Sequence, residues 1–183
     1  GVDLVVIGSG TVGASFFGTG HSIPSAATGS LVAEFGLEAG SPNLAFLGTI
    51  GVGGLFDANC DQPVGMLAQV RLAAVSNRSG PVGLFVGTRF QGAWAVNDTL
   101  VVDTADDPDT TENEWDGHYE RQLGSDAYLG WVDIGPRVAF SPRGVHSGWI
   151  LPTLSAGPGL RSVNNDLVLS GQVGFQLAVG GTF

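Results

Sequence analysis

The stretch DLVLSGQVGFQLAVGGTF, residues Asp166–Phe183, alternates between two kinds of residue. One face is mostly apolar and ends in an aromatic ring, whereas the other carries small or polar residues such as Gln172 and Gln176. A period of two is typical of a β-strand with two different faces. The strand would be about 17 residues long, well above the average of about 5–6 residues in globular sheets. The stretch therefore predicts an unusually long strand.

The same alternation recurs along the rest of the chain, while Gly and Pro interrupt the windows in which a helical stripe could form. Seven further stretches are predicted strands, at residues 2–17, 30–40, 43–56, 64–75, 81–96, 132–140 and 149–160. The first has the weakest alternation, because Val5 and Ile7 fall on its polar side. The segment TLVVDT, residues 99–104, is also strand-like, so a hairpin that raises the count to ten strands stays open.

Composition and charge exclude several classes of protein. Charged residues are only 13% of the 183 residues, and the 7 basic residues, all arginines, face 17 acidic ones for a net charge of −10. This balance argues against a nucleic-acid partner, because phosphate binding needs positive charge. The chain has no run of about 18 apolar residues for a transmembrane helix. A lone cysteine, Cys60, excludes an intramolecular disulfide and a cysteine-based zinc site. The length fits a single domain, residues 1–183.

The non-apolar faces of these strands are small and poor in charge, which suits an enclosed interior better than a water-exposed surface. We therefore expect the apolar faces to point into lipid and the other faces to line the lumen of a closed barrel, where every backbone group is paired. Charges in such a lumen should pair, because an unpaired one is costly. The predicted lumen network consists of Glu34, Glu38, Gln69, Arg71, Arg89, Gln91, Asp133 and Arg137. The fold class is all-β, a closed antiparallel up-and-down transmembrane β-barrel of about eight strands.

In this architecture the whole chain resembles the small eight-stranded outer-membrane β-barrels of Gram-negative bacteria, the type of outer-membrane protein A. The C-terminal strand carries the most specific likeness, since Phe175, Leu177, Val179 and Phe183 look like the signal read by the barrel-assembly machinery. The resemblance implies a monomer in the bacterial outer membrane, with outer-membrane lipids and that machinery as partners. Loop lengths put both termini on the periplasmic side. Gly181 and the low content of Tyr and Trp depart from the family pattern.

A second motif, Gly8-Ser9-Gly10-Thr11-Val12-Gly13, has the G-x-G-x-x-G spacing of dinucleotide-binding proteins. That motif needs a following helix whose N-terminus meets the pyrophosphate. The residues after Gly13 carry several Gly and Pro breakers and no apolar stripe. We therefore expect no cofactor, and we expect these glycines to relieve crowding or to permit coiling in a curved strand.

The polar loops offer only weak candidates for chemistry. Asp116, His118 and Ser125 can be drawn as a triad, yet a loop does not preorganise catalytic groups. The other histidines, His21 and His146, also fall in loops. The acidic stretch of residues 103–120 is expected to be a solvated extracellular loop. Its weak candidates for divalent-cation ligands are Asp106, Asp107, Asp109 and Glu112.

These observations predict a non-enzymatic outer-membrane barrel with a structural, surface-recognition or narrow, porin-like channel role. An eight-stranded lumen is just wide enough for side chains to fill, which argues against a wide pore. Two alternatives stay open. One is an outer-membrane lipid-modifying enzyme, and the other is a soluble, lipocalin-like ligand-binding barrel.

Overall fold

The computed structural model describes residues 1–17, 26–57, 64–95, 99–102, 117–120, 126–140, 147–163 and 166–183. These residues form ten strands, with bounds β1 (Val2–Phe17), β2 (Ala26–Gly40), β3 (Leu44–Asp57), β4 (Val64–Ser76), β5 (Val82–Ala95), β6 (Thr99–Val102), β7 (Gly117–Glu120), β8 (Asp126–Ala139), β9 (Ser147–Val163) and β10 (Asp166–Thr182). The described residues contain no helix that is long and apolar enough to cross a membrane.

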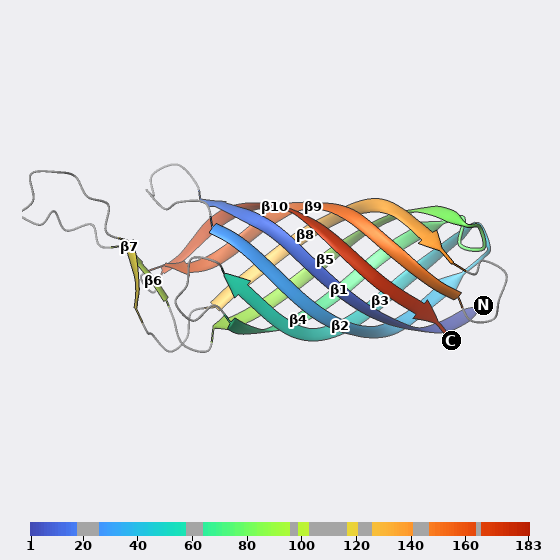
Figure 1. Cartoon of the computed structure of the whole chain (residues 1–183), viewed down its shortest axis with the longest axis horizontal. Coiled ribbons are helices and arrows are strands. Elements are labelled where there is room, and N and C mark those ends of the chain that lie inside the picture. The colour runs from blue at the N-terminus through green and yellow to red at the C-terminus, as the bar shows by residue number, and fades with distance from the viewer. Residues whose placement is uncertain are drawn as a thin grey trace, which may run out of the picture.

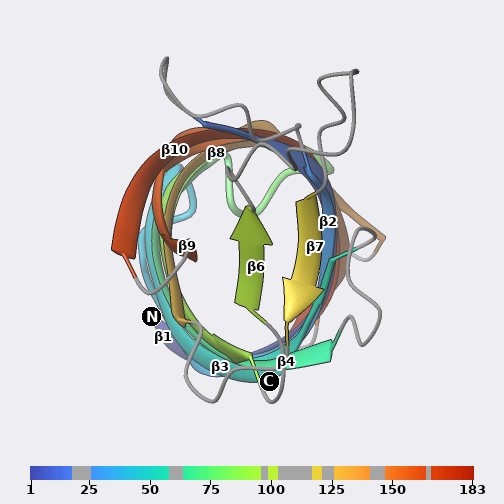
Figure 2. The same ribbon diagram turned by 90° about the vertical axis from the view of Figure 1, so that its left-hand side faces the viewer.

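Eight of the strands close into a barrel (Figures 1 and 2). The order runs β10-β1-β2-β3-β4-β5-β8-β9, and β9 pairs with β10 to complete the ring. Neighbours in the ring are antiparallel throughout. Closure leaves the wall without an edge strand. The predicted closed, antiparallel, up-and-down barrel of eight strands is therefore confirmed.

The two ends of the barrel differ. At one end, which we call the turn end, lie both termini and the short connections after β2 and β4, residues 41–43 and 77–81. At the other, the loop end, β6 and β7 pair as a hairpin over residues 99–102 and 117–120. Among the described residues, one backbone pairing joins this hairpin to the wall, the parallel pairing Leu100↔Val163. The strand-like segment of the long loop thus forms a hairpin outside the barrel, and the wall keeps eight strands.

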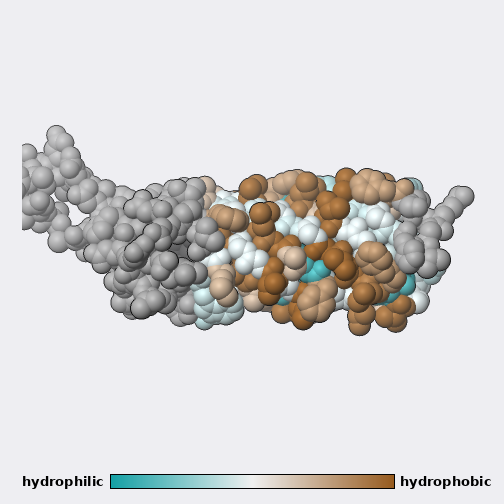
Figure 3. Space-filling view, turned by 60° about the horizontal axis from the view of Figure 1, so that its bottom comes forward, coloured by the Kyte–Doolittle hydropathy of each residue, from teal (hydrophilic) through white to brown (hydrophobic). Residues whose placement is uncertain are grey.

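The apolar faces of the strands point outward. Phe35, Phe46, Phe90 and Phe175 lie on the outer surface with 44–62% of each residue exposed. Figure 3 shows apolar side chains spread over the displayed face of the barrel wall. The interior contains the opposite set, since Arg71, Arg89, Glu38 and Asp133 are fully buried. The wall is therefore apolar outside and polar inside, the reverse of a water-soluble barrel.

Several strands begin earlier than the alternation predicts. β8 starts at Asp126 rather than Val132, and β2 starts at Ala26 rather than Ser30. In β8 the prediction failed because Leu129 and Trp131 fill interior positions with apolar side chains, which hides the alternation. Val5 and Ile7 do the same in β1, where both are buried in the lumen. A narrow interior has to pack, so it is not uniformly polar.

The G-x-G-x-x-G motif lies wholly within β1, and no helix follows it in the described residues. Gly13 pairs with Gly174, and a Cβ at Gly13 would lie 2.7 Å from the Val173 carbonyl oxygen. Crowding therefore explains the glycine at this position. At Gly8 a Cβ would meet nothing within 4 Å, so crowding does not explain that glycine.

Candidate functional site: the interior polar network

All eight predicted lumen residues lie in the interior, each with 5% or less of its surface exposed. They come from four strands, β2, β4, β5 and β8. Hydroxyl groups of β1, β3 and β9 bind to them. The strand alternation explains this convergence, because each residue occupies an inward position of its strand. The residues divide into three groups along the barrel axis.

The central network contains two buried ion pairs, Glu34–Arg71 and Arg89–Asp133. Arg71 Nη2 donates to Glu34 Oε1 at 2.9 Å. Ser9 and Thr49 hydroxyls donate to the same carboxylate at 3.0 and 2.6 Å. Three donors from three strands therefore converge on Glu34, so protein groups compensate its negative charge.

The second pair is bidentate. Arg89 Nε and Nη2 donate to the two carboxylate oxygens of Asp133 at 2.6 and 3.0 Å. Arg89 also donates to the Thr11 and Ser155 hydroxyls, both at 3.1 Å, and Ser155 donates to Asp133 at 2.5 Å. This cluster links β5 to β8, β9 and β1 across the lumen. A fork-shaped guanidinium suits such a bidentate contact.

A second group of charges, the mouth network, lies at the turn end. Glu38 contacts Arg78 Nε at 2.6 Å and Arg137 Nη2 at 3.3 Å, and Arg78 also pairs with Asp3. The sequence-based network omitted Asp3 and Arg78. Arg78 follows β4 in a turn and reaches back over the mouth, which strand alternation alone does not show.

The third group lies toward the loop end and is neutral. Gln91 Nε2 donates to Gln69 Oε1 at 2.7 Å, and Trp131 Nε1 donates to Gln91 Oε1 at 2.8 Å. Trp131 also lies under Arg89, whose guanidinium carbon is 5.2 Å from the ring centroid. Arg71 stacks over Phe85 and Arg137 over Trp149 in the same way. Each of these three arginines thus meets an aromatic face as well as an acid.

Apolar clusters flank the central network on both sides. The turn-end cluster consists of Val5, Ile7, Leu47, Ala73, Val75, Phe85, Trp149, Leu151 and Ala178. The loop-end cluster consists of Val32, Leu67 and Ala93, with Leu55 and Ala127 packed against it. Along β1, for example, Val5 and Ile7 separate Asp3 from Ser9. The interior is thus filled by paired charges between two apolar layers.

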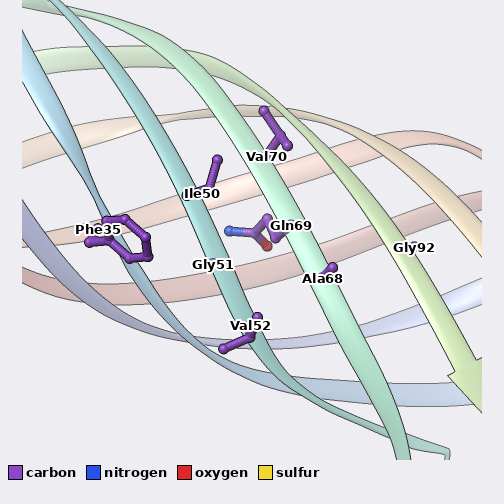
Figure 4. Close-up of a pocket in the computed structure, with 8 residues that line it drawn as sticks. All are labelled: Phe35, Ile50, Gly51, Val52, Ala68, Gln69, Val70 and Gly92. Atoms are coloured by element: carbon purple, nitrogen blue, oxygen red, sulfur yellow. The ribbon is translucent and has the colours of Figure 1, made fainter.

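The outer wall carries an open groove of about 430 Å³ over β2–β5, drawn in Figure 4. Phe35, Ile50 and Val70 flank it with outward apolar side chains. Ala68 and Gly92, which pair with each other, leave the depression because their side chains are small or absent. Such a lining suits an apolar occupant.

The remaining sequence-based candidates fall mainly outside the described residues. Asp116 and Ser125 of the supposed triad lie there, as do His21, His146, Cys60 and the cation candidates Asp106, Asp107, Asp109 and Glu112. His118 lies on β7, where only the backbone is described. Within the described part of the chain, no cluster of three or more His, Cys, Asp or Glu side chains could hold a metal ion.

Three residues of the predicted assembly signal lie on β10, which closes the barrel against β1 and β9, and the fourth, Phe183, directly follows this strand. The side chains of Phe175, Leu177, Val179 and Phe183 all point outward. Phe183 exchanges backbone hydrogen bonds with Leu4 at 2.9 and 3.2 Å, so the last residue is part of the wall. Recognition of these residues by an assembly machinery stays a prediction.

No protein-family model matches the chain, and no curated protein matches it in sequence. Among solved structures, it is similar to the crystal structure of neisserial surface protein A, with a TM-score of 0.54. The match covers 100% of this chain and 99% of that one at 13% sequence identity. At this identity the likeness concerns the fold. The chain thus has the fold of a small outer-membrane β-barrel, as the sequence resemblance implied.

Proposed function

We propose that this chain is a bacterial outer-membrane barrel with a structural or surface-recognition role and no enzymatic activity of its own. The observation that carries the proposal is the inverted wall. Aromatic and aliphatic side chains cover its outside, while balanced ion pairs fill its inside. Water would leave the outer faces unfavourably hydrated, whereas hydrocarbon solvates them and the closed ladder satisfies the backbone. A soluble lipocalin-like carrier would need the opposite arrangement.

A surface-recognition role fits the interior better than a channel role. Two apolar clusters flank the central ion pairs, so a solute in the lumen would have to displace both apolar layers and paired charges. The loop end carries a hairpin that extends beyond the wall, on the side opposite the termini. In the proposed orientation, the termini are periplasmic and this end faces outside the cell. Lipid acyl chains would then contact the outer wall, including the groove beside Phe35 and Val70.

Two measurements test this proposal. A folded membrane barrel should need detergent or lipid to stay in solution and should migrate differently on SDS gels before and after boiling. A protein that is monodisperse without detergent would refute the membrane location. In planar bilayers, we expect no stepwise conductance from the purified barrel. Reproducible single-channel steps would show that the interior is open to ions, and they would favour a narrow channel over a recognition role.

A further inference from the structure

Three prolines interrupt the wall in two neighbouring strands. Pro136 lies in β8, and Pro152 and Pro158 lie in β9. All three occupy outward positions of their strands, alternating with the buried Arg137, Leu151 and Thr153 on the inner face. Proline has no N–H, so it removes one donor from the ladder and is normally confined to sheet edges or bulges. A closed barrel has no edge, so each proline here costs the wall a hydrogen bond.

The positions of the N–H groups that the three prolines lack all face the boundary between β8 and β9, which we call the β8–β9 seam. At the turn end, Ala139 donates to Pro81 on the β5 side, whereas Phe140 donates to Gly148 on the β9 side. Even-numbered residues of β8 therefore direct their N–H groups toward β9, because the direction alternates along a strand. By the same rule, the residues of β9 that lie opposite them direct theirs toward β8. Pro136, Pro152 and Pro158 all leave their gaps between β8 and β9.

The register confirms this assignment. Pairing between β8 and β9 breaks off after Leu129↔Gly159 and again after Ile134↔Leu154. Continued across the breaks, the register puts Pro136 opposite Pro152, and Pro158 opposite Gly130. The pairings of β8 with β5 and of β9 with β10 run through the same prolines without a break. In the described residues, the other wall seams are likewise continuous.

Side chains from the lumen compensate for part of this loss. Gln172 Nε2 donates to the Pro158 carbonyl oxygen at 3.1 Å. Between the two breaks, Ser155 on β9 donates to Asp133 on β8 at 2.5 Å, and Arg89 binds both. The middle of the seam is thus held by the central network. At Pro136 and Pro152, by contrast, two ladder hydrogen bonds are missing together.

The inner side of this gap is bordered by the turn-end apolar cluster, with the buried polar side chains of Arg137 and Thr153 beside it. Gly135 has no side chain to cover it, and its partner on β5 is Phe85, a member of the turn-end cluster. Leu151 and Trp149 of the same cluster lie next to Pro152 on the inner face of β9. In this structure the strands are in contact, since a Cβ at Gly135 would meet the Pro152 carbonyl oxygen. The contact is held by packing and not by hydrogen bonds, so separating the strands here breaks fewer bonds than elsewhere.

We propose that the β8–β9 seam opens laterally at Pro136 and Pro152 and admits the acyl chain of a membrane lipid to the turn-end apolar cluster. This inference rests on the proposed membrane location, which places hydrocarbon chains against the outer side of the gap. An acyl chain fits because hydrocarbon lies against the outer side of the gap and the turn-end cluster beyond it is apolar except for the Nε1 group of Trp149, whereas a polar solute would have to cross hydrocarbon to reach the gap. The ion-paired stretch around Asp133 and Ser155 limits the opening toward the loop end.

The first test measures opening by amide hydrogen exchange in lipid nanodiscs. We expect amides beside the gap, such as those of Val138 and Leu154, to exchange about tenfold faster than amides at equivalent depth in β3 and β4, because a missing ladder bond weakens the local structure. The double variant Pro136→Val/Pro152→Val restores two donors and should slow this exchange about tenfold. The control Pro81→Val, in a turn, should leave the exchange unchanged. If the amides beside the gap exchange at the same rate as the amides in β3 and β4, the proposal is overturned.

The second test asks whether lipid chains enter. In a variant whose only tryptophan is Trp149, made by Trp94→Phe, Trp115→Phe and Trp131→Phe, brominated acyl chains in the vesicles should quench the fluorescence of this buried ring. The double proline variant in the same background should lose most of that quenching. Quenching that is absent, or equal in both proteins, would overturn lateral entry.

A reporter on the outer wall separates this outcome from failure of the proposed function. In a tryptophan-free background, Phe90→Trp places a ring at an outward position. Its quenching by brominated chains reports contact with lipid regardless of the seam. If the Trp at position 90 is quenched and Trp149 is not, the result supports the membrane location and refutes the lateral opening. If this reporter is also unquenched, the membrane location itself is refuted. A heat-dependent gel shift of each variant verifies that it has folded.

Discussion

The buried pair of Arg89 and Asp133 gives the sharpest test of the inverted interior. Both side chains are fully buried, and the guanidinium donates to both carboxylate oxygens at 2.6 and 3.0 Å. Replacing Arg89 by Met keeps a long side chain but leaves the Asp133 carboxylate with only the Ser155 hydroxyl as a described donor. The replacement thus removes the compensating charge and little volume.

The expected cost is large. Breaking a buried ion pair by removing one partner typically costs about 3–5 kcal/mol, because the other charge is left uncompensated. Thr11 and Ser155 lose a donor as well, which adds about 1 kcal/mol at most. If the second charge is also removed, in Arg89→Met/Asp133→Leu, the desolvation penalty disappears. The double variant should therefore recover about 3 kcal/mol relative to Arg89→Met alone.

The assay is urea-induced unfolding in phospholipid vesicles, with the folded fraction read from the unheated gel mobility and from tryptophan fluorescence. Arg78→Met is the matched control. Arg78 is partly exposed at the mouth, and Glu38 keeps Arg137 as a second cation, so this change should cost about 1 kcal/mol or less. If Arg89→Met is no more costly than the control, or if the double variant is less stable than either single variant, the paired interior is the wrong account.

Three further predictions follow from the wall and the hairpin. Phe90→Arg puts a charge on the outward face and should reduce the free energy of unfolding in vesicles by about 2–4 kcal/mol, provided the residue lies near the midplane. Gly36→Ala should prevent folding to the heat-shifted form, because its Cβ would lie 2.0 Å from the Gly48 carbonyl oxygen, whereas Gly8→Ala meets nothing within 4 Å and should fold normally. Replacing residues 97–122 by a short Gly-Ser link should leave the urea midpoint unchanged, because the one backbone pairing between this hairpin and the wall in the described residues is Leu100↔Val163.

The alternation of side chains predicted the barrel and most of its interior, since strand periodicity fixes which residues share a face. Glu34, Arg71 and Arg89 were placed inside from the sequence because they fall on the face of each strand that lies opposite the mostly apolar one. The specific partners were not predictable. Whether Arg71 meets Glu34 or Asp133 depends on the stagger between strands, which a single sequence does not reveal. The role of Arg78 was missed for a related reason, because a turn residue has no alternation to read.

At the β8–β9 seam, the register that buries the charged residues of β8 also decides which neighbouring strand loses the proline hydrogen bond. In a strand of L-residues, the side chain and the N–H alternate together, so an outward residue on β8 always directs its N–H to the same neighbour. The register that buries Arg137 and Asp133 also makes Pro136 an outward residue and aims its missing donor at β9. A slip of one residue would turn the proline donor gap toward β5, yet it would expose both charges on the apolar wall. The slip would only move the missing hydrogen bond to the other neighbour, whereas it would expose two charges, so the ion pairs of the lumen fix the side on which the proline gap lies.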